Sequence, residues 1–493
     1  MTGAEAAVVE THSAVVFFFG DRAYKVKKPV DLGFLDFRSR QARLAVCQRE
    51  VELNRRLAPD VYLGVADVTG PDGQPCDHLV VMRRMPADRR LSTLVASGAD
   101  VDDHLWRLAH LLAAFHARAE RSPQADEAAG ADATGRRWAA NTAEMVPFTG
   151  RYLDERHVAI VDDLAQRYLA GRVPLFERRV ADGRACDGHG DLLADDVFCL
   201  DDGPRVLDCI EFDEDLRLGD TLADVAFLAM DLERLGRRDL AERFLTAYRE
   251  HAADTWPPSL AHHHVAYRAQ VRAKVSAIRA AQGDEPSGPE AHRLLALARD
   301  HLDAARVRLV VVGGLPGTGK STLAAALGDA RDATVLRSDE VRKELAGLRP
   351  DQHPPAGFGE GIYRPELTEA TYATMLGRAG VGLGLGQSVV LDASWPDPTW
   401  RDEARAVAAA GHADLVELRC VTPPDVAAGR IRARQATGGD PSDATPEIAA
   451  AMAQRELPWP TATPVDTTSP LARIVESALA RFDGEAAAPA GSG

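Results

Sequence analysis

The spacing of apolar residues divides the chain into two parts of different character. Near the N-terminus, the apolar runs 14–19 and 23–27 flank a Gly-Asp turn and predict a β-hairpin that ends in lysines. Helical spacing over 38–57 predicts one helix, and the run 78–82 predicts another strand. Most segments after residue 101 have helical periodicity. We therefore expect a two-lobed α+β domain, in which a small sheet is followed by a larger helical region.

Residues that break regular structure mark the boundaries of the parts. The cluster 282–289 is rich in glycine, proline and acidic residues, and helical spacing resumes over 290–306. The last ten residues are small and polar, which predicts a disordered tail, and an Ala-, Gly- and Asp-rich stretch over 122–135 predicts a surface loop. The expected division is 1–285 for the first domain, 286–306 for a connector, 307–482 for the second domain and 483–493 for the tail.

The segment from Gly313 to Thr322 carries the pattern of a phosphate-binding loop. The apolar run 309–312 precedes it and 323–327 follows it, so that strand, glycine loop and helix occur in the required order. In such a loop, backbone N–H groups and a helix N-terminus surround a polyphosphate, and the lysine reaches the terminal phosphates. We expect ATP to be bound by Gly314, Gly317, Thr318, Gly319, Lys320, Ser321 and Thr322, with Ser321 also binding Mg²⁺.

Further candidate residues follow this loop. The stretch 334–345 predicts a short strand leading into an amphipathic helix, which places Asp339 at a strand's carboxyl end. Asp339 is a candidate proton acceptor and Arg342 a candidate holder of a phosphate or anionic substrate, although Asp339 also suits a helix N-terminus. Asp392 ends another strand, where a Walker B acid would hold Mg²⁺. Arg430 and Arg434 precede a Gly-rich loop and are candidates to close over ATP.

Together these features resemble a small P-loop kinase of the group described as AAA-type ATP-binding domains, similar to gluconate, polynucleotide and antibiotic kinases. The resemblance covers about residues 307–482 and implies an α/β fold with a parallel sheet. The sequence shows no arginine-finger segment of the oligomeric kind. A kinase is therefore expected rather than a mechanical ATPase.

The first part contains acidic residues that suit phosphoryl transfer. Asp191 and Asp208 each lie beside a short apolar segment. Phosphoryl transfer needs one carboxylate to orient the attacking hydroxyl and others to hold Mg²⁺ on the phosphates. Lys25 on the hairpin is a candidate for binding phosphates, with Glu50 as its partner. Lys27 has the same strand parity, so parity alone leaves both lysines open, and we prefer Lys25.

The run His189-Gly190-Asp191-Leu192 resembles the aminoglycoside phosphotransferase-like branch of the protein-kinase-like fold. The resemblance implies that Asp191 is the catalytic base, that Asp208 binds metal, and that Glu50 pairs with the phosphate lysine. The second metal position, normally Asn, is Asp196 here. An aspartate preserves an oxygen ligand but adds negative charge near ATP.

Composition narrows the possible partners. Asp and Glu outnumber Lys and Arg by 74 to 58, a net charge of −16, which disfavours broad nucleic-acid binding. The sequence shows neither a membrane span nor a secretory signal, so we expect a cytoplasmic protein. Its six cysteines form no CxxC pair, which disfavours a zinc site or a disulfide framework.

The sequence therefore predicts a fusion of a kinase-like domain and a P-loop kinase domain. The expected reaction is Mg·ATP-dependent transfer of the γ-phosphoryl group to a hydroxyl of a small polar molecule such as a sugar, amino-alcohol or aminoglycoside. Three alternatives stay open: a regulatory ATP-binding protein with an impaired kinase-like domain, a polynucleotide 5′-hydroxyl kinase, and a chaperone-like ATPase.

Overall fold

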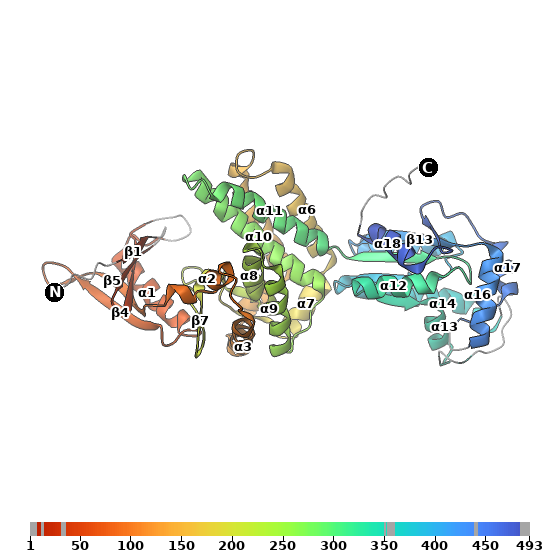
Figure 1. Ribbon diagram of the computed structural model, residues 1–493, viewed down its shortest axis with the longest axis horizontal. Helices are drawn as coiled ribbons and strands as arrows, with labels where there is room; N and C mark the ends of the chain where they lie inside the picture. Colours follow the sequence, from red (N-terminus) through yellow and green to blue (C-terminus); the bar gives the residue numbers. More distant parts are fainter. Residues whose placement is uncertain are drawn as a thin grey trace. The chain divides into compact units, whose positions relative to one another are not determined.

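The computed structural model describes residues 7–10, 14–30, 36–349, 352, 360–437 and 442–483. The predicted tail from residue 484 onward and residues 438–441 of the predicted Gly-rich loop lie outside these ranges. The chain separates into two compact units (Figure 1). The N-terminal unit comprises Met1–Ala165, Phe176–Trp256 and Ala261–Leu302, and the C-terminal unit comprises Gln166–Leu175, Pro257–Leu260 and Asp303–Gly493.

The N-terminal unit begins with a five-stranded antiparallel sheet of order β1-β2-β3-β5-β4. The predicted hairpin is present, and β1 and β4 are strands that the sequence analysis did not anticipate. Helix α1 packs Cys47 and Val51 against Val80 and Met82 of the sheet, so one sheet face forms the core of this lobe. The elements are β1 (Ala7–Glu10), β2 (Ala14–Phe19), β3 (Arg22–Lys27), α1 (Arg40–Asn54), β4 (Tyr62–Thr69) and β5 (Pro75–Arg83).

The chain from residue 84 to residue 304, most of which belongs to the N-terminal unit, is largely helical, as predicted. Two short ribbons, β6–β9 and β7–β8, carry the segments with the candidate aspartates. The helices are α2 (Leu91–Ala96), α3 (Asp102–Arg118), α4 (Pro123–Ala129), α5 (Ala131–Met145), α6 (Glu155–Gly171), α7 (Val173–Ala181), α8 (Thr221–Arg234), α9 (Arg238–His251), α10 (Pro258–Ala281) and α11 (Ser287–Ala304), with 3₁₀ turns at Ala87–Arg89, Val146–Phe148 and Ala194–Asp196. The ribbons are β6 (Ala185–Asp187), β7 (Val197–Leu200), β8 (Gly203–Val206) and β9 (Leu218–Asp220).

The predicted surface loop over 122–135 is wrong, because this stretch forms α4 and the start of α5. The Ser122 hydroxyl accepts a hydrogen bond from the backbone N–H of Ala125 (3.1 Å), and Pro123 occupies the first helical position. Ala125 and Ala129 are buried against Leu218. Small side chains that look loop-like in sequence here allow a helix to pack closely.

The C-terminal unit is built on a five-stranded parallel sheet of order β11-β12-β10-β13-β14. Strand β10 is entirely buried at the centre of the sheet. Helices α12 and α18 cover one face, where Leu323 and Ile474 join the core beside Val310. Helix α14 packs against β12, where Gly382 lies close to Val389. The predicted α/β P-loop fold is confirmed. The strands are β10 (Arg308–Gly313), β11 (Thr334–Arg337), β12 (Val389–Asp392), β13 (Asp414–Val421) and β14 (Thr463–Asp466).

The helices of this unit place its loops at the carboxyl ends of the strands, where parallel sheets bind ligands. They are α12 (Lys320–Arg331), α13 (Ser338–Leu345), a 3₁₀ turn at Gly361–Tyr363, α14 (Pro365–Gly384), α15 (Pro398–Ala410), α16 (Pro424–Thr437), α17 (Pro446–Ala453) and α18 (Leu471–Phe482).

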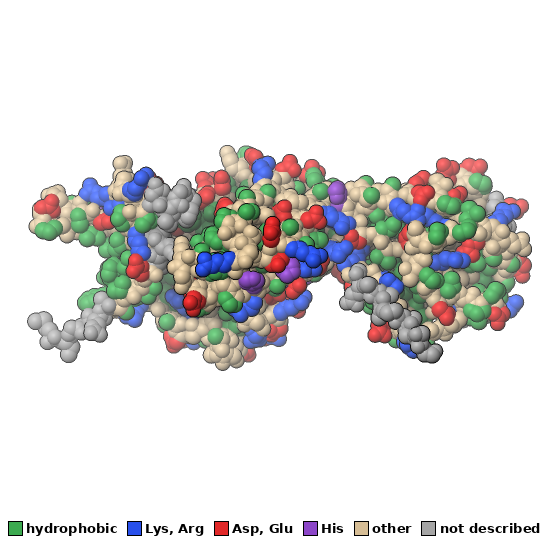
Figure 2. Space-filling view, turned by 90° about the horizontal axis from the view of Figure 1, so that it is seen from above, with side chains coloured by type: hydrophobic (Ala, Val, Ile, Leu, Met, Phe, Trp, Pro, Cys, Tyr) green, Lys and Arg blue, Asp and Glu red, His purple; other side chains and the backbone are tan. Residues whose placement is uncertain are grey.

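Two features of the surface bear on the class of partner. Within the described ranges, no helix is long and apolar enough to cross a bilayer. On the face seen in Figure 2, acidic and basic side chains are interspersed and form no continuous basic band.

Candidate nucleotide and acceptor sites

The phosphate-binding loop depends on glycine at two tightly packed positions. Gly314 has a φ of 138°, and a Cβ atom there would lie 2.7 Å from the Cys420 carbonyl oxygen. Gly317 has a φ of 80°, and its Cβ would lie 2.5 Å from the Ala427 carbonyl oxygen. Any larger residue would push the loop away from these backbones. The Thr318 hydroxyl donates to the Leu315 carbonyl (2.8 Å) and holds the loop closed on itself.

Helix α12 begins immediately after this loop. Gly319 has left-handed backbone angles at the N-cap position, and no side chain caps the helix. The first backbone N–H groups of α12 are consequently left for a ligand, as anion binding at a helix N-terminus requires. Lys320 and Ser321 lie in the first turn, and Thr322 is exposed beside them. The predicted loop residues are therefore brought together around one helix end.

Asp392 ends β12, beside the central strand, at the register of Val312 and Arg337. Its carboxylate is buried, Oδ1 has no hydrogen-bond partner among the described residues, and Oδ2 accepts from Arg337 Nε at 3.3 Å. Burial raises the pKa of Asp392, and Lys320, the Ser321 hydroxyl and Arg337 oppose that shift. A buried carboxylate oxygen without a partner beside the Ser321 hydroxyl suits Mg²⁺, which is held through oxygen ligands and water.

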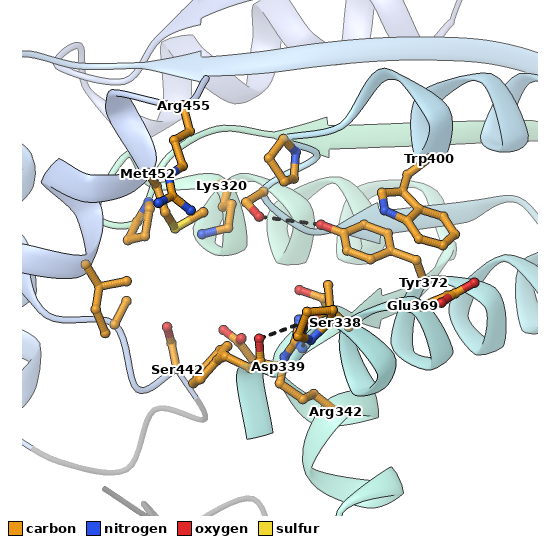
Figure 3. Close-up of a pocket in the computed structure, with 18 residues that line it drawn as sticks. Lys320, Ser338, Asp339, Arg342, Glu369, Tyr372, Trp400, Ser442, Met452 and Arg455 are labelled. Atoms are coloured by element: carbon orange, nitrogen blue, oxygen red, sulfur yellow. Dashed lines mark hydrogen bonds between the residues drawn. The ribbon is translucent and has the colours of Figure 1, made fainter. Parts of the chain in front are cut away.

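A cavity of about 480 Å³ opens in front of Lys320. Figure 3 shows Lys320 on one side of this space and Asp339, Ser338 and Arg342 on the other. The cavity therefore joins the phosphate-binding lysine to both residues predicted as catalytic in this domain. Its remaining lining comes from Tyr363, Pro365, Thr368, Glu369, Tyr372, Ser394, Pro396, Trp400, Ser442, Ala444, Ile448, Met452, Arg455 and Pro316.

Arg342 is held rigidly at the wall of this cavity. It is 6% exposed, its Nη1 donates to the Thr368 hydroxyl (2.9 Å), and its guanidinium lies 4.9 Å from the centre of the Tyr363 ring. Its Nε is buried and has no hydrogen-bond partner. One donor of a fixed guanidinium is thus left for a ligand oxygen.

The sequence analysis missed the aromatic wall of the cavity. The Tyr372 and Trp400 rings stack with centroids 5.1 Å apart and an interplanar angle of 14°. Neither residue belongs to a motif, and they come from different helices, α14 and α15. Only packing brings them together.

The two late arginines contact the loop and its surroundings. Arg430 donates from Nη1 to the Thr467 hydroxyl (3.1 Å) and from Nη2 to the Thr467 carbonyl (2.8 Å). The Thr467 hydroxyl in turn donates to the Thr318 carbonyl in the phosphate-binding loop (2.6 Å). Arg434 donates to the Ala444 carbonyl (3.3 Å). Arg430 therefore supports the loop, and Arg434 supports a segment that lines the cavity.

The second candidate site, in the N-terminal unit, is organised around buried ion pairs. Lys25 Nζ lies 2.8 Å from Glu50 and 2.6 Å from Asp208. Lys27 Nζ lies 2.7 Å from the other Glu50 oxygen and 2.5 Å from Glu211. Lys25 lowers the pKa of Asp208 to about 2; burial raises the pKa of Glu50, but the two lysines leave it below its ordinary value. Both lysines thus hold Glu50, and of the two only Lys25 contacts Asp208.

The segment before Asp191 is fixed by the carboxylate of Asp224. Asp224 accepts hydrogen bonds from the backbone N–H groups of His189 and Gly190, both at 2.8 Å. It also contacts His116 Nε2 at 3.0 Å. Asp220 caps α8, since its carboxylate accepts from the Leu222 N–H.

The carboxylates of this site raise one another's affinity for protons. Burial raises the pKa of Asp191 to about 6. Burial and then Asp208 and Asp191 raise the pKa of Asp196 well above its ordinary value. Such mutual repulsion suits a bound cation. Within the described ranges no three His, Cys, Asp or Glu side chains form a complete metal site, so Asp196 and Asp208 would share Mg²⁺ with phosphate oxygens and water.

Comparison with known proteins shows which family the chain belongs to. Residues 309–458 match a family model described as an AAA domain. Uncharacterized proteins from Mycobacterium tuberculosis and Mycobacterium bovis are each 44% identical over 471 residues, covering 96% of this chain and 94% of the relative. The chain belongs to the family of these mycobacterial proteins. The P-loop domain predicted from the sequence is thereby confirmed.

Solved kinases also resemble parts of the chain. A sugar kinase from Janibacter is 19% identical and covers 36% of this chain and 95% of its own, with a TM-score of 0.28. A choline/ethanolamine kinase family protein from Mesorhizobium loti is 15% identical and covers 62% of this chain and 92% of its own, with a TM-score of 0.41.

Proposed function

We propose that this protein is a Mg·ATP-dependent phosphotransferase with two kinase sites, each transferring the γ-phosphoryl group to a hydroxyl of a small polar molecule. The observation that carries the proposal is the cavity in which Lys320 faces Asp339 and Arg342. A phosphate-binding lysine, a carboxylate and an arginine around one enclosed space are what transfer to an alcohol needs.

In the P-loop site, the loop backbone and Lys320 would hold the ATP phosphates, and Ser321 and Asp392 would hold Mg²⁺. Bound Mg²⁺ neutralises charge on the phosphates. Asp339 accepts the proton of the acceptor hydroxyl, whose oxygen forms a bond to the γ-phosphorus while the bond to ADP breaks. Arg342 donates from Nε to the acceptor and orients it. We also propose that Arg430 and Arg434 contact ATP.

In the kinase-like site, Lys25 would hold phosphates and Glu50 would position it. Asp208 and Asp196 would bind Mg²⁺, and Asp191 would accept the proton of the acceptor hydroxyl. The aspartate at position 196 retains an oxygen ligand. Arg268 and Arg272 influence Asp191 electrostatically and lower its pKa against the effect of burial, which favours the ionised form that a base requires.

The test is ADP release measured against a panel of small alcohols. Lys320→Ala should abolish the part of the turnover due to the P-loop site, and Asp191→Asn the part due to the kinase-like site. Lys274→Ala and Asp182→Asn, which alter peripheral ion pairs, serve as matched controls. Full acceptor-dependent turnover in the Lys320→Ala, Asp191→Asn double variant would refute the proposal.

A second candidate function, polynucleotide 5′-hydroxyl kinase, is favoured by the stacked Tyr372 and Trp400 beside Arg342. Aromatic rings stack on bases, and an arginine suits a substrate phosphate. Transfer of labelled phosphate to oligonucleotide 5′ ends, lost in Asp339→Asn, would support this function over a small-molecule kinase.

A further inference from the structure

Helix α10 carries two arginines, Arg268 and Arg272, that are four residues apart and so lie on the same side of the helix. Arg268 Nε donates to the Ala223 carbonyl on α8 (3.0 Å), and its guanidinium lies 4.7 Å from the centre of the Phe227 ring. Ala223 directly precedes Asp224, the carboxylate that holds the backbone of His189 and Gly190. Arg268 is thereby fixed beside the segment that leads into Asp191.

Arg272 has no partner of its own. In the described part of the chain its guanidinium makes no hydrogen bond and no ion pair within 4.0 Å, and its Nε is buried. Burial raises the pKa of Asp191, and Arg272 is the charged group that opposes this shift most strongly. The two side chains therefore interact through space without contact. The charge of Arg272 therefore acts on the candidate base.

A third arginine, Arg137, lies near the same segment. Its Nη1 donates to the Leu218 carbonyl at 3.3 Å, and its Nη2 donates to the Ala128 carbonyl at 2.5 Å and to the Thr134 hydroxyl at 3.3 Å. No carboxylate of the described residues lies within 4.0 Å of it. Burial lowers the pKa of Arg137, and Arg268 lowers it further. The acceptors of this half-buried guanidinium are all neutral, so its positive charge is not compensated by a contacting carboxylate.

Arg137 and Arg268 line a cavity of about 40 Å³ together with Arg217. Arg217 is 4% exposed, and its Nη2 is buried without a hydrogen-bond partner. This cavity borders the candidate catalytic segment, because a Cβ atom on Gly190 would lie 3.2 Å from Arg217 Cγ. Since one water needs roughly 10–15 Å³ of such space, the cavity has room for one small anionic group but not for a ring.

The acidic residues lining this cavity are mostly committed elsewhere. Asp220 pairs with Arg179 at 2.7 Å, and Asp224 holds the backbone of His189 and Gly190. Asp215 is exposed and forms no ion pair within 4.0 Å in the described part of the chain. Arg217 has its own partner in Asp187 at 2.8 Å. Arg137, Arg268 and Arg272 therefore form a positive cluster whose charge is not neutralised by contacting carboxylates, in a chain whose net charge is −16.

The geometry points to an anionic acceptor for the kinase-like site: a small alcohol whose hydroxyl faces Asp191 and whose carboxylate or phosphate binds Arg268 and Arg272, with Arg137 nearby. This inference rests on the proposed function of that site. The inferred acceptor is negatively charged, whereas an amino-alcohol or aminoglycoside acceptor is positively charged. The transferred atoms are the same: the hydroxyl proton goes to Asp191, an O–P bond forms and ADP leaves.

The test uses the full chain with Lys320→Ala, so that the P-loop site is silent. ADP release is measured with four matched acceptors: glycerate, glycerol 3-phosphate, glycerol and choline. We expect an anionic acceptor to have a KM at least tenfold below that of glycerol, and the comparison of glycerate with glycerol 3-phosphate separates carboxylate from phosphate. Arg272→Gln should remove this preference, Arg272→Lys should restore part of it, and Arg279→Gln, an exposed arginine on the same helix, should leave it intact.

If no turnover is detected, a binding measurement tests the inference of an anionic acceptor. Inorganic phosphate is titrated calorimetrically into the Lys320→Ala protein, and a component should be lost in Arg272→Gln and Arg268→Gln but kept in Arg279→Gln. Turnover that depends on Asp191 with choline but not with anionic alcohols would overturn the inference and leave the proposed function standing. If no acceptor gives Asp191-dependent turnover, the proposed function of this site fails; unchanged phosphate binding in Arg272→Gln would then overturn the inference as well.

Discussion

The two candidate nucleotide sites neutralise charge by different means. The P-loop site is made of backbone, with glycines that allow the chain to approach Cys420 and Ala427, and Lys320 forms no ion pair within 4.0 Å in the described ranges. The kinase-like site is made of side chains, and Lys25 and Lys27 are already engaged by Glu50, Asp208 and Glu211.

This difference has a consequence for nucleotide binding. Phosphates can enter the P-loop without displacing a side-chain partner, because backbone N–H groups at a helix end await an anion. In the kinase-like site, phosphates must share Lys25 with Glu50, and Mg²⁺ must share Asp208 with Lys25. Nucleotide binding to the kinase-like site therefore replaces part of the existing ion pairs. The affinity for nucleotide depends on the free energy of the ion pairs that are lost.

The largest effect should come from breaking the buried ion pairs of the kinase-like site. Lys27→Met leaves Glu50 and Glu211 without their shared cation, and removing one partner of a buried pair costs about 3–5 kcal/mol. Chemical denaturation of the variant should show this loss. Lys28→Met, which removes an ion pair to the exposed Glu10, should cost far less stability than Lys27→Met. Equal losses in the two variants would contradict the idea that side-chain charges organise this site.

The P-loop site should respond in activity and not in stability. Lys320→Ala removes the lysine from the cavity, where it faces Asp339, and should lower turnover at this site by about 100-fold or more. Steady-state ADP release in the Asp191→Asn background measures the effect, with Lys274→Ala as control. A large fall in stability, with turnover per folded molecule unchanged, would show that Lys320 has a structural role.

A smaller effect should follow from adding a methyl group to the loop. Gly317→Ala places a side chain at a positive φ and 2.5 Å from the Ala427 carbonyl, and such backbone strain costs about 1–3 kcal/mol. ATP affinity measured by calorimetry should fall, since the loop must shift. Gly377→Ala, in α14 with open space around it, should instead stabilise the protein by about 0.5–1 kcal/mol. An unchanged ATP affinity in Gly317→Ala would mean that the phosphate-binding loop can shift without losing affinity for ATP.

The smallest expected effect is the pH dependence of turnover at the kinase-like site. Asp191 must be ionised to accept a proton, and burial raises its pKa to about 6, so turnover at the kinase-like site should rise as the pH increases through about 6. Because the folded pKa lies above the unfolded value, the stability contributed by protonated Asp191 is complete below pH about 3.9 and is lost as the pH rises through about 6. A pH series on Lys320→Ala measures the turnover. A profile flat between pH 5 and 7 would exclude Asp191 as the base.

The fold was largely predictable, for reasons that differ between regions. The hairpin of β2 and β3 and the buried strand β10 have clear apolar patterns, and both appear as expected. The stretch 122–135 was wrongly predicted as a loop because its composition resembles one, whereas Ala125 and Ala129 are buried against a neighbouring strand. Strand β4 was missed because its exposed positions leave little periodicity.

Sequence alone determined the phosphate-binding loop, because a strand, a run of glycines with special backbone angles and a helix start are local features within about twenty residues. The aspartates of both candidate sites were also proposed from the sequence, and their roles stay predictions. Tertiary structure alone decided that Lys27 meets Glu211, 184 positions away, and that Tyr372 stacks on Trp400. It also decided that Arg272 Nε is buried without a hydrogen-bond partner among the described residues. Such contacts depend on how helices and sheets pack. Packing is determined by the whole core and cannot be read from the sequence around each residue.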